Sequence, residues 1–417
     1  MKLLTFLGIA NYRETLYKWE GRGYRSRFSP LASCAFLEPE EIIVFLTADA
    51  ERDIFPEFAR EVPESVRVRP VPVPLGADEA ELWHIFDLVA GCVSPGEEVA
   101  FDITNGLRSF PLLGLLAAAF LRSGLDVRLK AVLYGAFDVG RVLGNGETPM
   151  FDLTPMLALL EWSAAADRFN RTGDSRYLAS LIAAQRNSLG KAAQGDPDLQ
   201  NEAGQLGNLA GALTSISQSL QFIRPAETME SAEGLAERVE KARPALARSA
   251  AAQPFVMLLD SIQHTYSPLG MPSPLGQENI WLSLRKQREI IRWYAAREQW
   301  VQAVTLAREW VVNWFMAHLE LRDITSSEDR ARIEQVINTE SRQYIAARQR
   351  KTAFNSLFLR GIPSLPEALR LWSRLGDVRN DINHAGMRPD PGRPKDLIET
   401  IARNLELLDS LPLEPSA

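Results

Sequence analysis

The chain has 417 residues, of which 46% are hydrophobic, and a formal net charge of -7. This length favours two or three domains with ordinary apolar cores. The acidic balance excludes a surface that is basic throughout, so any contact with nucleic acid is expected to be local. The two cysteines, Cys34 and Cys92, are too few and too isolated for a disulfide framework or a thiolate zinc site. We expect both to be packing residues in a reducing cytoplasm.

The apolar segments are too short to cross a membrane. The N-terminal run MKLLTFLGI meets polar residues without a small-residue cleavage pattern, so we interpret it as a first buried strand. The longest strongly apolar run, Phe110 to Leu121, has about 12 residues, whereas a helix that spans a bilayer needs roughly 20. The sequence therefore predicts a soluble, cytoplasmic protein without membrane contact.

Up to about residue 155, apolar runs rich in β-branched residues alternate with amphipathic stretches. Strands are predicted at LLTFLGI, EIIVFLT, VRVRPVPV, EEVAFDIT and VRLKAVLYGAF, with helices around 51–60, 78–91 and 109–123. This alternation is typical of a mostly parallel sheet with helices on its faces, an α/β fold. Ligands of such sheets bind at the carboxyl ends of the strands.

Two of the predicted strands end in glycine-containing turns. The run DITNGLRSFP predicts a strand, a polar turn over 104–106 and a helix that begins near Ser109, whose N-terminal N–H groups and Arg108 suit phosphate oxygens. After the first strand, Gly8 leaves room for a ligand, and Asn11 and Tyr12 offer hydrogen bonds or a stacking surface. The alternative is that the glycines only form tight turns, while Arg108 is solvated and Tyr12 covers the core.

From Leu157 to the C-terminus the sequence has helical periodicity and no convincing strand. The run SPLGMPSPLGQ, residues 267–277, is dense in Pro, Gly and Ser and indicates a boundary within this helical half. We therefore predict an α/β domain over 1–155, a helical linker region over 156–276 and a helical bundle over 277–412.

The run RNDINHAG lies near the end of one of these helices. An apolar stripe on this helix is predicted to face the core and consists of Leu371, Leu375, Val378 and Ile382. Four polar residues lie away from this stripe, namely Arg379, Asn380, Asn383 and His384. Imidazole can exchange protons near neutral pH and guanidinium can hold a scissile phosphate, which together indicate phosphodiester cleavage without a metal. The alternative is an ordinary helix C-terminus, where cations are favoured, and an Arg-x4-His spacing also arises by chance among 38 arginines.

The remaining histidines lack such a context. His84, His264 and His318 are expected to have structural roles. The sequence contains no HExxH, Walker, GxSxG or GxGxxG motif, so zinc hydrolysis, nucleotide hydrolysis, esterase activity and dinucleotide-dependent oxidation lack support.

Taken together, LGIANY, DITNGLRSFP with the later LYGAFD, and the spacing of Arg379 and His384 resemble the CRISPR-associated CARF-HEPN ribonucleases of type III systems. The resemblance implies an α/β Rossmann-like N-terminal CARF domain and an all-α C-terminal half that ends in a HEPN helical bundle. It also implies a homodimeric endoribonuclease that cyclic oligoadenylate, with four or six nucleotides in the ring, activates as part of antiviral defence.

The resemblance also assigns roles to residues. Arg379 would stabilise the charge that develops on the phosphorus, His384 would assist proton transfer as the 2′-hydroxyl of single-stranded RNA attacks, and Asn380 and Asn383 would position them. No cofactor or metal is implied. The residues implied to contact the cyclic ligand lie after four strands: Gly8, Asn11, Tyr12, Thr47, Thr104, Asn105, Gly106, Arg108 and Gly135. Relatives often carry a histidine where this chain has Asn105, so cleavage of the ring is not predicted.

Two other functions fit the same elements. In the first, the chain is a non-catalytic regulator that binds a cyclic nucleotide and acts through its helical half on a protein or DNA, and RNDINH is ordinary helix surface. In the second, the α/β domain itself is a nucleotide-binding enzyme and the helices only dimerise. Alanine at His384 distinguishes the ribonuclease from both alternatives, because in the ribonuclease it should abolish RNA cleavage and preserve ligand binding.

Overall fold

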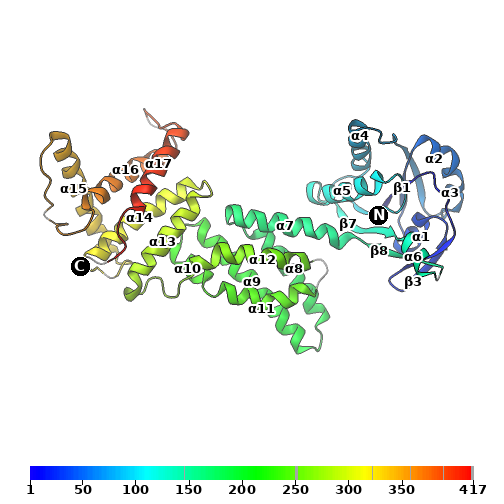
Figure 1. Ribbon diagram of the computed structural model, residues 1–417, viewed down its shortest axis with the longest axis horizontal. Helices are drawn as coiled ribbons and strands as arrows, with labels where there is room; N and C mark the ends of the chain where they lie inside the picture. The colour runs from blue at the N-terminus through cyan, green and yellow to red at the C-terminus, as the bar shows by residue number, and fades with distance from the viewer. Residues whose placement is uncertain (145, 249–251, 322, 357, 388, 415–417) are drawn as a thin grey trace. The chain divides into compact units, whose positions relative to one another are not determined.

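The computed structural model describes residues 1–144, 146–248, 252–321, 323–356, 358–387 and 389–414 (Figure 1). The chain forms two compact units, Met1–Leu160 and Glu161–Ala417. Each is described by itself.

An eight-stranded sheet forms the centre of the first unit, in the order β3-β2-β8-β7-β6-β1-β4-β5. Its strands are β1 (Lys2–Leu7), β2 (Thr15–Trp19), β3 (Arg22–Ser26), β4 (Glu41–Leu46), β5 (Arg67–Pro72), β6 (Glu98–Asp102), β7 (Arg128–Gly135) and β8 (Glu147–Asp152). The five strands from β7 to β5 in this order are all parallel, whereas β8 is antiparallel to β7 and β3 is antiparallel to β2. The predicted mostly parallel sheet is confirmed.

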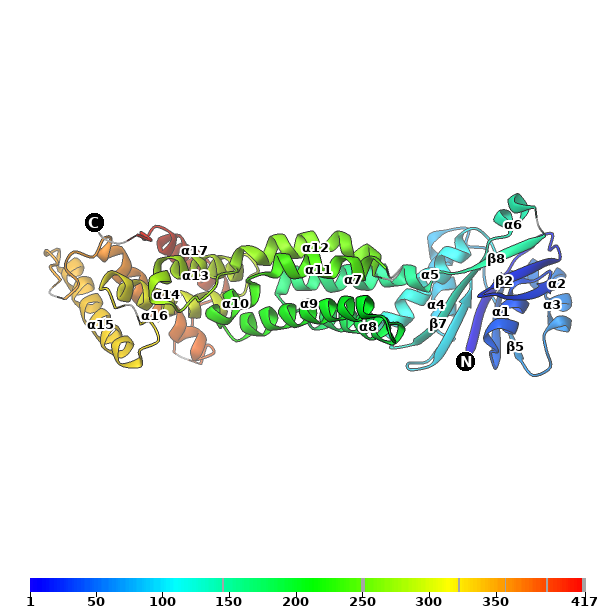
Figure 2. The same ribbon diagram turned by 90° about the horizontal axis from the view of Figure 1, so that it is seen from below.

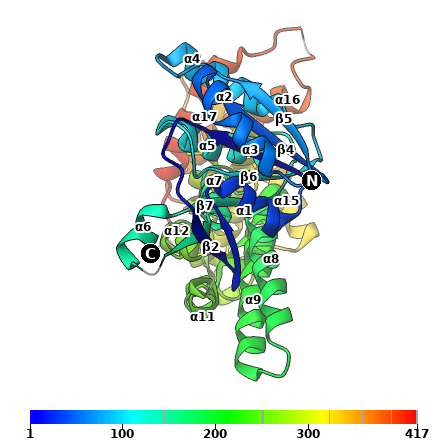
Figure 3. The ribbon, with the colours of Figure 1, turned by 90° about the vertical axis from the view of Figure 1, so that its right-hand side faces the viewer.

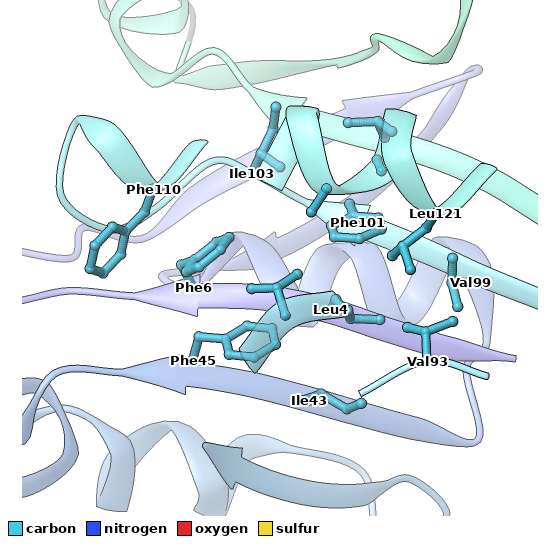
Figure 4. Close-up of a cluster of buried hydrophobic side chains, with 14 of the residues drawn as sticks. Leu4, Phe6, Ile43, Phe45, Val93, Val99, Phe101, Ile103, Phe110 and Leu121 are labelled. Atoms are coloured by element: carbon cyan, nitrogen blue, oxygen red, sulfur yellow. The ribbon is translucent and has the colours of Figure 1, made fainter. Parts of the chain in front are cut away.

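Helices cover both faces of this sheet. On one face, α4 (Glu79–Ala90) and α5 (Ser109–Gly124) enclose a core that includes Phe6, Phe45 and Phe110 (Figure 4). The ring centroid of Phe6 lies 5.2 Å from that of Phe45 and 5.3 Å from that of Phe110. On the other face, a second core includes residues of α1 (Ser29–Leu37), α2 (Ala48–Asp53) and α3 (Phe55–Glu61). The central strands are buried on both sides, which explains their continuous apolar sequences.

Several elements of this unit are not predicted from the sequence. The β2–β3 hairpin turns at Glu20 and Gly21, whose φ angles of 48° and 77° are typical of a type I′ turn. Both strands and β8 are short and partly exposed, so they lack the continuous apolar run of the central strands. Helix α1 is almost completely buried and has no polar face to reveal helical periodicity. A short helix, α6 (Phe137–Leu143), follows β7.

The second unit is helical. Its helices are α7 (Thr154–Thr172), which begins in the first unit, α8 (Arg176–Ala192), α9 (Pro197–Gln221), α10 (Pro225–Ala232), α11 (Leu235–Ala247), α12 (Gln253–Tyr266), α13 (Ile280–Ala295), α14 (Trp300–His318), α15 (Ser327–Arg350), α16 (Leu365–Asn383) and α17 (Pro394–Asp409). Helices α8 and α9 pack side by side as a hairpin (Figure 3), and α9 also packs along α11 (Figure 2). The described residues after Leu157 contain no strand, as the sequence predicts.

Helix α14 is the centre of the C-terminal bundle. It packs against α13, α15, α16 and α17, and its side chains are buried nearly all round. The indole N–H groups of Trp310 and Trp314 donate to the carbonyl oxygens of Leu284 (2.8 Å) and Pro412 (2.7 Å). These bonds satisfy two polar groups that would otherwise be unpaired in the core.

The α/β first unit and the helical remainder confirm the predicted fold class. Over the described ranges, the helices are all too short or too polar to pass through a lipid bilayer.

Candidate functional site

The predicted ligand residues of the first unit meet at one edge of the sheet. Because β1, β4, β6 and β7 are parallel, their carboxyl ends lie together. The turns after β1 and β6 touch, since a Cβ added at Gly8 would lie 3.1 Å from Cα of Gly106. The backbone N–H of Gly135, at the end of β7, donates to Oγ1 of Thr104 over 2.8 Å.

Both turn glycines have a packing role. Gly106 has φ +106°, and a Cβ there would lie 3.0 Å from Cδ2 of Phe110 and 3.1 Å from Cβ of Phe6. Only glycine adopts this backbone angle readily and avoids both contacts. These positions therefore agree with the tight-turn reading of the sequence, which needs no ligand.

Tyr12 and Thr47 face the protein more than the solvent. The hydroxyl of Tyr12 donates to the carbonyl oxygen of Gly8 (2.8 Å) and accepts from its N–H (3.2 Å), and the ring packs 4.9 Å from that of Phe28. Burial raises the pKa of Tyr12 to about 12. Thr47 is buried and is the residue immediately before α2. Tyr12 therefore holds the turn after β1 in place, and its hydroxyl is already hydrogen-bonded.

Other residues of the edge are open to solvent. Asn11, Gly106 and Arg108 are exposed, and Ile9 is 62% exposed although it is apolar. Within the described ranges the Arg108 side chain makes no hydrogen bond or ion pair. An unpaired guanidinium next to the N-terminus of α5 is the strongest anion-binding feature of this edge.

The sequence analysis did not identify Asp102, which lies directly beneath the turn. It is fully buried at the end of β6 and accepts hydrogen bonds from Ser29 (3.2 Å), Ser33 (2.6 Å) and the backbone N–H of Thr104 (3.0 Å). The side-chain amide of Asn105 donates to the same Ser29 hydroxyl over 2.8 Å. Burial raises the pKa of Asp102. The available signal was an aspartate at the end of a predicted strand and directly before a turn, because an aspartate there can accept a hydrogen bond from the backbone N–H two residues later, as in an Asx-turn.

The second candidate site lies at the end of α16. Of the four residues in the predicted core-facing stripe, Leu371, Leu375 and Val378 are buried and Ile382 is half-buried. The helix ends at Asn383, and the N–H of His384 still donates to the carbonyl oxygen of Asn380 over 3.1 Å. The next residues, Ala385 and Gly386, have φ angles of 51° and 70° and end the helix, as the glycine predicts.

The four polar residues of the motif are all exposed: Arg379, Asn380, Asn383 and His384. In the described part of the chain, the side chains of Arg379 and His384 have no hydrogen-bonding or ionic partner. Five residues along a helix correspond to a rotation of about 140°, so Arg379 and His384 lie on different flanks of α16. The Cβ atoms of the two residues therefore leave the helix axis in different directions.

Asp381, inside the same motif, fixes the following loop. It is buried, and its Oδ2 accepts from the N–H of Gly392 over 2.7 Å. This bond joins α16 to the segment that precedes α17.

A second arginine lies behind Arg379, on α14. The guanidinium carbon of Arg308 lies 3.8 Å from the ring centroid of Trp372, which is two helical turns before Arg379 on the same face of α16. Nη2 of Arg308 is 3.9 Å from Oε2 of Glu334, and its buried Nη1 has no hydrogen-bond partner among the described residues. Burial, and then the charge of Arg379, lower the pKa of Arg308.

Arg379 and the unpaired Nη1 of Arg308 offer N–H groups that suit an incoming phosphate. Sequence reasoning missed Arg308 because its contact with α16 is tertiary. An arginine within the mostly apolar α14 was the available signal.

The other histidines differ from His384. His318 packs edge-on against Trp281 (4.8 Å) and Trp314 (4.3 Å), and burial lowers its pKa to about 4, in agreement with the expected structural role. His84 is exposed on α4, and His264 is exposed on α12.

These features define a class of protein: an α/β unit with an open strand-end edge, followed by a helical unit that exposes an unpaired arginine and histidine. Within the helical part, residues 158–269 match the family model described as CRISPR-associated protein MJ1674, second domain. The CRISPR-associated protein MJ1674 of Methanocaldococcus jannaschii is 34% identical over 113 residues, which are 26% of this chain and 18% of that protein. The resemblance to CRISPR-associated proteins is thereby confirmed.

This chain aligns with less than a fifth of that relative's length. The segment matched by the family model contains neither candidate site. Among solved structures, Enterococcus italicus Csm6 bound to cyclic hexa-2′-fluoro-hexa-dAMP aligns with 98% of this chain and 92% of its own, at 9% identity and a TM-score of 0.45. We draw no ligand or activity from a likeness at that level.

Proposed function

We propose that this chain is a metal-independent endoribonuclease of type III CRISPR defence that cyclic oligoadenylate activates. The observation that carries the proposal is the exposed, unpaired Arg379 and His384 at the end of α16, with the half-buried Arg308 close enough to Arg379 for the two charges to interact. This chemistry belongs to a chain whose middle helices match a CRISPR-associated family. In this proposal residues 1–155 are the CARF domain, 156–276 the helical linker region and 277–412 the HEPN domain.

The proposed ligand site is the strand-end edge of the first unit. Arg108 and the N-terminus of α5 would bind phosphate, while Asn11, Asn105 and the turn backbones would contact the nucleosides. Gly8 and Gly106 would allow the two turns to pack closely at the edge. Tyr12 and Thr47 would hold the backbone of the edge in place and would not contact the ligand through free polar groups. The proposed ligand has a ring of four or six adenylates, and no cofactor is required.

The proposed assembly is a homodimer. Along α5, Leu112, Leu116 and Phe120 recur every four residues and are 60%, 49% and 48% exposed. An apolar stripe of this kind on a surface helix favours association. A two-fold dimer also suits a cyclic ligand with repeated units, and it would bring a second copy of α16 to complete a site that one chain leaves open.

The proposed reaction is a transesterification. The 2′-oxygen attacks the adjacent phosphorus, the bond from phosphorus to the 5′-oxygen breaks, and the products are a 2′,3′-cyclic phosphate and a 5′-hydroxyl. His384 would transfer protons, Arg379 would stabilise the phosphorane charge, and Asn380 and Asn383 would position the strand. Arg308 would add a second positive charge that attracts the phosphate.

One observation favours a non-catalytic regulator instead. Arg379 and His384 lie on different flanks of α16, so they form no active site unless a second copy supplies the missing group. In this alternative the helical half binds a protein or DNA partner while the α/β unit still senses a cyclic nucleotide.

The test is cleavage of a fluorophore-quencher RNA in EDTA, with cyclic tetra-adenylate, cyclic hexa-adenylate or no ligand. We expect cleavage with one ring size only, and its loss in His384→Ala but not in His264→Ala, an exposed histidine distant in sequence. Arg108→Ala should bind the ligand more weakly and need more of it for the same cleavage. Ligand binding without cleavage at any concentration would favour the regulator.

A further inference from the structure

The C-terminal bundle contains a hollow separate from Arg379 and His384. It lies between α15 and α16 and has a volume of about 380 Å³. Three arginines contribute to its lining, together with one aromatic, one aliphatic and two other polar residues: Tyr344, Ile345, Arg348, Gln349, Arg370, Ser373 and Arg374. We refer to it as the α15–α16 groove. Arg374 precedes Arg379 on α16 by five residues, which is about 7.5 Å along the helix axis.

The three arginines of this groove lack protein partners. Over the described ranges, none of Arg348, Arg370 and Arg374 makes a hydrogen bond or an ion pair, and Nε of Arg370 is buried without a partner. Elsewhere on the same bundle, Arg332 pairs with a glutamate over 3.4 Å and Arg403 does so over 3.1 Å. Guanidinium groups that share one hollow repel each other, and a buried donor without a partner costs free energy. An anion in the groove removes both costs.

The sequence around the groove is basic although the chain is acidic. Residues 342–393 contain ten Arg and Lys residues and four Asp and Glu residues, whereas the whole chain has a net charge of -7. The excess is concentrated on arginine, whose planar fork of N–H groups matches phosphate oxygens.

The groove also offers an aromatic ring. Tyr344 is half-buried, and its ring meets that of Phe354 edge-on at 5.3 Å. Sites for single-stranded nucleic acid combine two components. Basic side chains contact the sugar-phosphate backbone, and an aromatic side chain stacks on a base. An acidic peptide would use the arginines but not the ring.

We propose that the α15–α16 groove binds the backbone of single-stranded RNA and holds the substrate on the helix that carries Arg379 and His384. This inference rests on the proposed function for the identity of the strand. The groove itself takes no part in the bond-breaking step.

The test is the affinity of the full-length protein for a fluorescent 2′-O-methyl RNA, measured by anisotropy over a range of salt concentrations. This RNA has no attacking hydroxyl, so binding is measured apart from cleavage. The double variant Arg348→Gln, Arg374→Gln should raise the Kd about tenfold or more and reduce the salt dependence by roughly one to two phosphate contacts. The matched control is Arg332→Gln, Arg403→Gln, which removes the same charge from ion-paired positions. Tyr344→Leu should weaken binding several-fold, while Tyr344→Phe should not.

Equal weakening in both double variants, or no change in the groove variant, would overturn the inference even if the protein cleaves ordinary RNA. Groove-dependent binding of 2′-O-methyl RNA without cleavage of ordinary RNA would reject the proposed nuclease and support the groove. The inference would also be overturned, in favour of an acidic polypeptide, if polyglutamate bound as tightly as RNA and its binding were lost in the groove variant.

Discussion

At the scale of single residues, the buried carboxyl of Asp102 and the half-buried guanidinium of Arg308 differ in their partners. Asp102 accepts three hydrogen bonds and forms no ion pair with any described residue, and Tyr17 and Cys34 lie close enough for its charge to raise their pKa values. Burial raises the pKa of Asp102 itself. Arg308 has an aromatic face on one side and a distant glutamate on the other.

We predict that Asp102→Asn makes the first unit more stable at neutral pH. The pKa of Asp102 is higher in the folded protein than in the unfolded chain, where it is near 3.9. Asp102 therefore contributes its full share to the free energy of unfolding below pH 3.9, and this contribution is lost as pH rises through the folded-state pKa. The advantage of the variant should thus grow by about 1.4 kcal/mol per pH unit between these two values. Denaturation at several pH values between 4 and 8 measures this, and a constant difference would contradict it.

For Arg308 we predict a separation of stability from activity. Arg308→Met keeps an apolar chain over Trp372 and removes a buried donor without a partner, so the free energy of unfolding should change by less than about 1 kcal/mol or increase. RNA cleavage should fall about tenfold or more, because one guanidinium near the phosphate is lost. Single-turnover rates for Arg308→Met and for Arg308→Lys, which keeps the charge, provide the measurement. Unchanged cleavage in the methionine variant would assign Arg308 to packing alone.

At the scale of elements, the turn between β6 and α5 depends on glycine for two separable reasons. Gly106→Ala should lower the free energy of unfolding by roughly 2–3 kcal/mol, from its positive φ and from contacts with Phe6 and Phe110. Gly96 has φ +78° but nothing within 4 Å of an added Cβ, so Gly96→Ala should cost only about 1 kcal/mol. Urea unfolding of both variants measures the difference. Equal losses would show that crowding at Gly106 is relieved by small shifts.

The elements also show which features a single sequence reveals. The strands β1, β4 and β6 were predicted because burial on both faces requires continuous apolar runs, and parallel pairing then fixes where their ends meet. The β2–β3 hairpin was missed because a half-exposed strand of five residues has little pattern. Neither the contact of Arg308 with Trp372 nor the α15–α16 groove could be predicted, because each joins helices whose packing the periodicity leaves open.

At the scale of the whole molecule, the chain divides into two compact units, and a chain of this kind can unfold in more than one step. A ligand that binds only the first unit should raise the unfolding temperature of that unit, by a shift that grows with the logarithm of ligand concentration above the Kd. Such a shift, measured by calorimetry, would locate the sensor independently of any nuclease assay.

The proposed dimer gives a further prediction at this scale. Leu116→Glu together with Phe120→Glu places charges on the exposed stripe of α5 and should weaken self-association about tenfold or more, without unfolding the protein. Sedimentation velocity over a range of concentrations measures this. Glutamates at Met257 and Val301, also exposed, should leave the association unchanged. A monomer in every variant would remove the dimer from the proposal.

The placement of tryptophan has a spectroscopic consequence. Seven of the nine tryptophans follow residue 160, and only Trp19 and Trp83 belong to the first unit. Trp372 lies under the guanidinium of Arg308, so its emission depends on where that charge is. Because adenylate absorbs little where indole is excited, a change in tryptophan emission that ligand causes in unlabelled protein, and that is lost in Trp372→Phe, would report whether binding in the first unit rearranges Arg308 in the second.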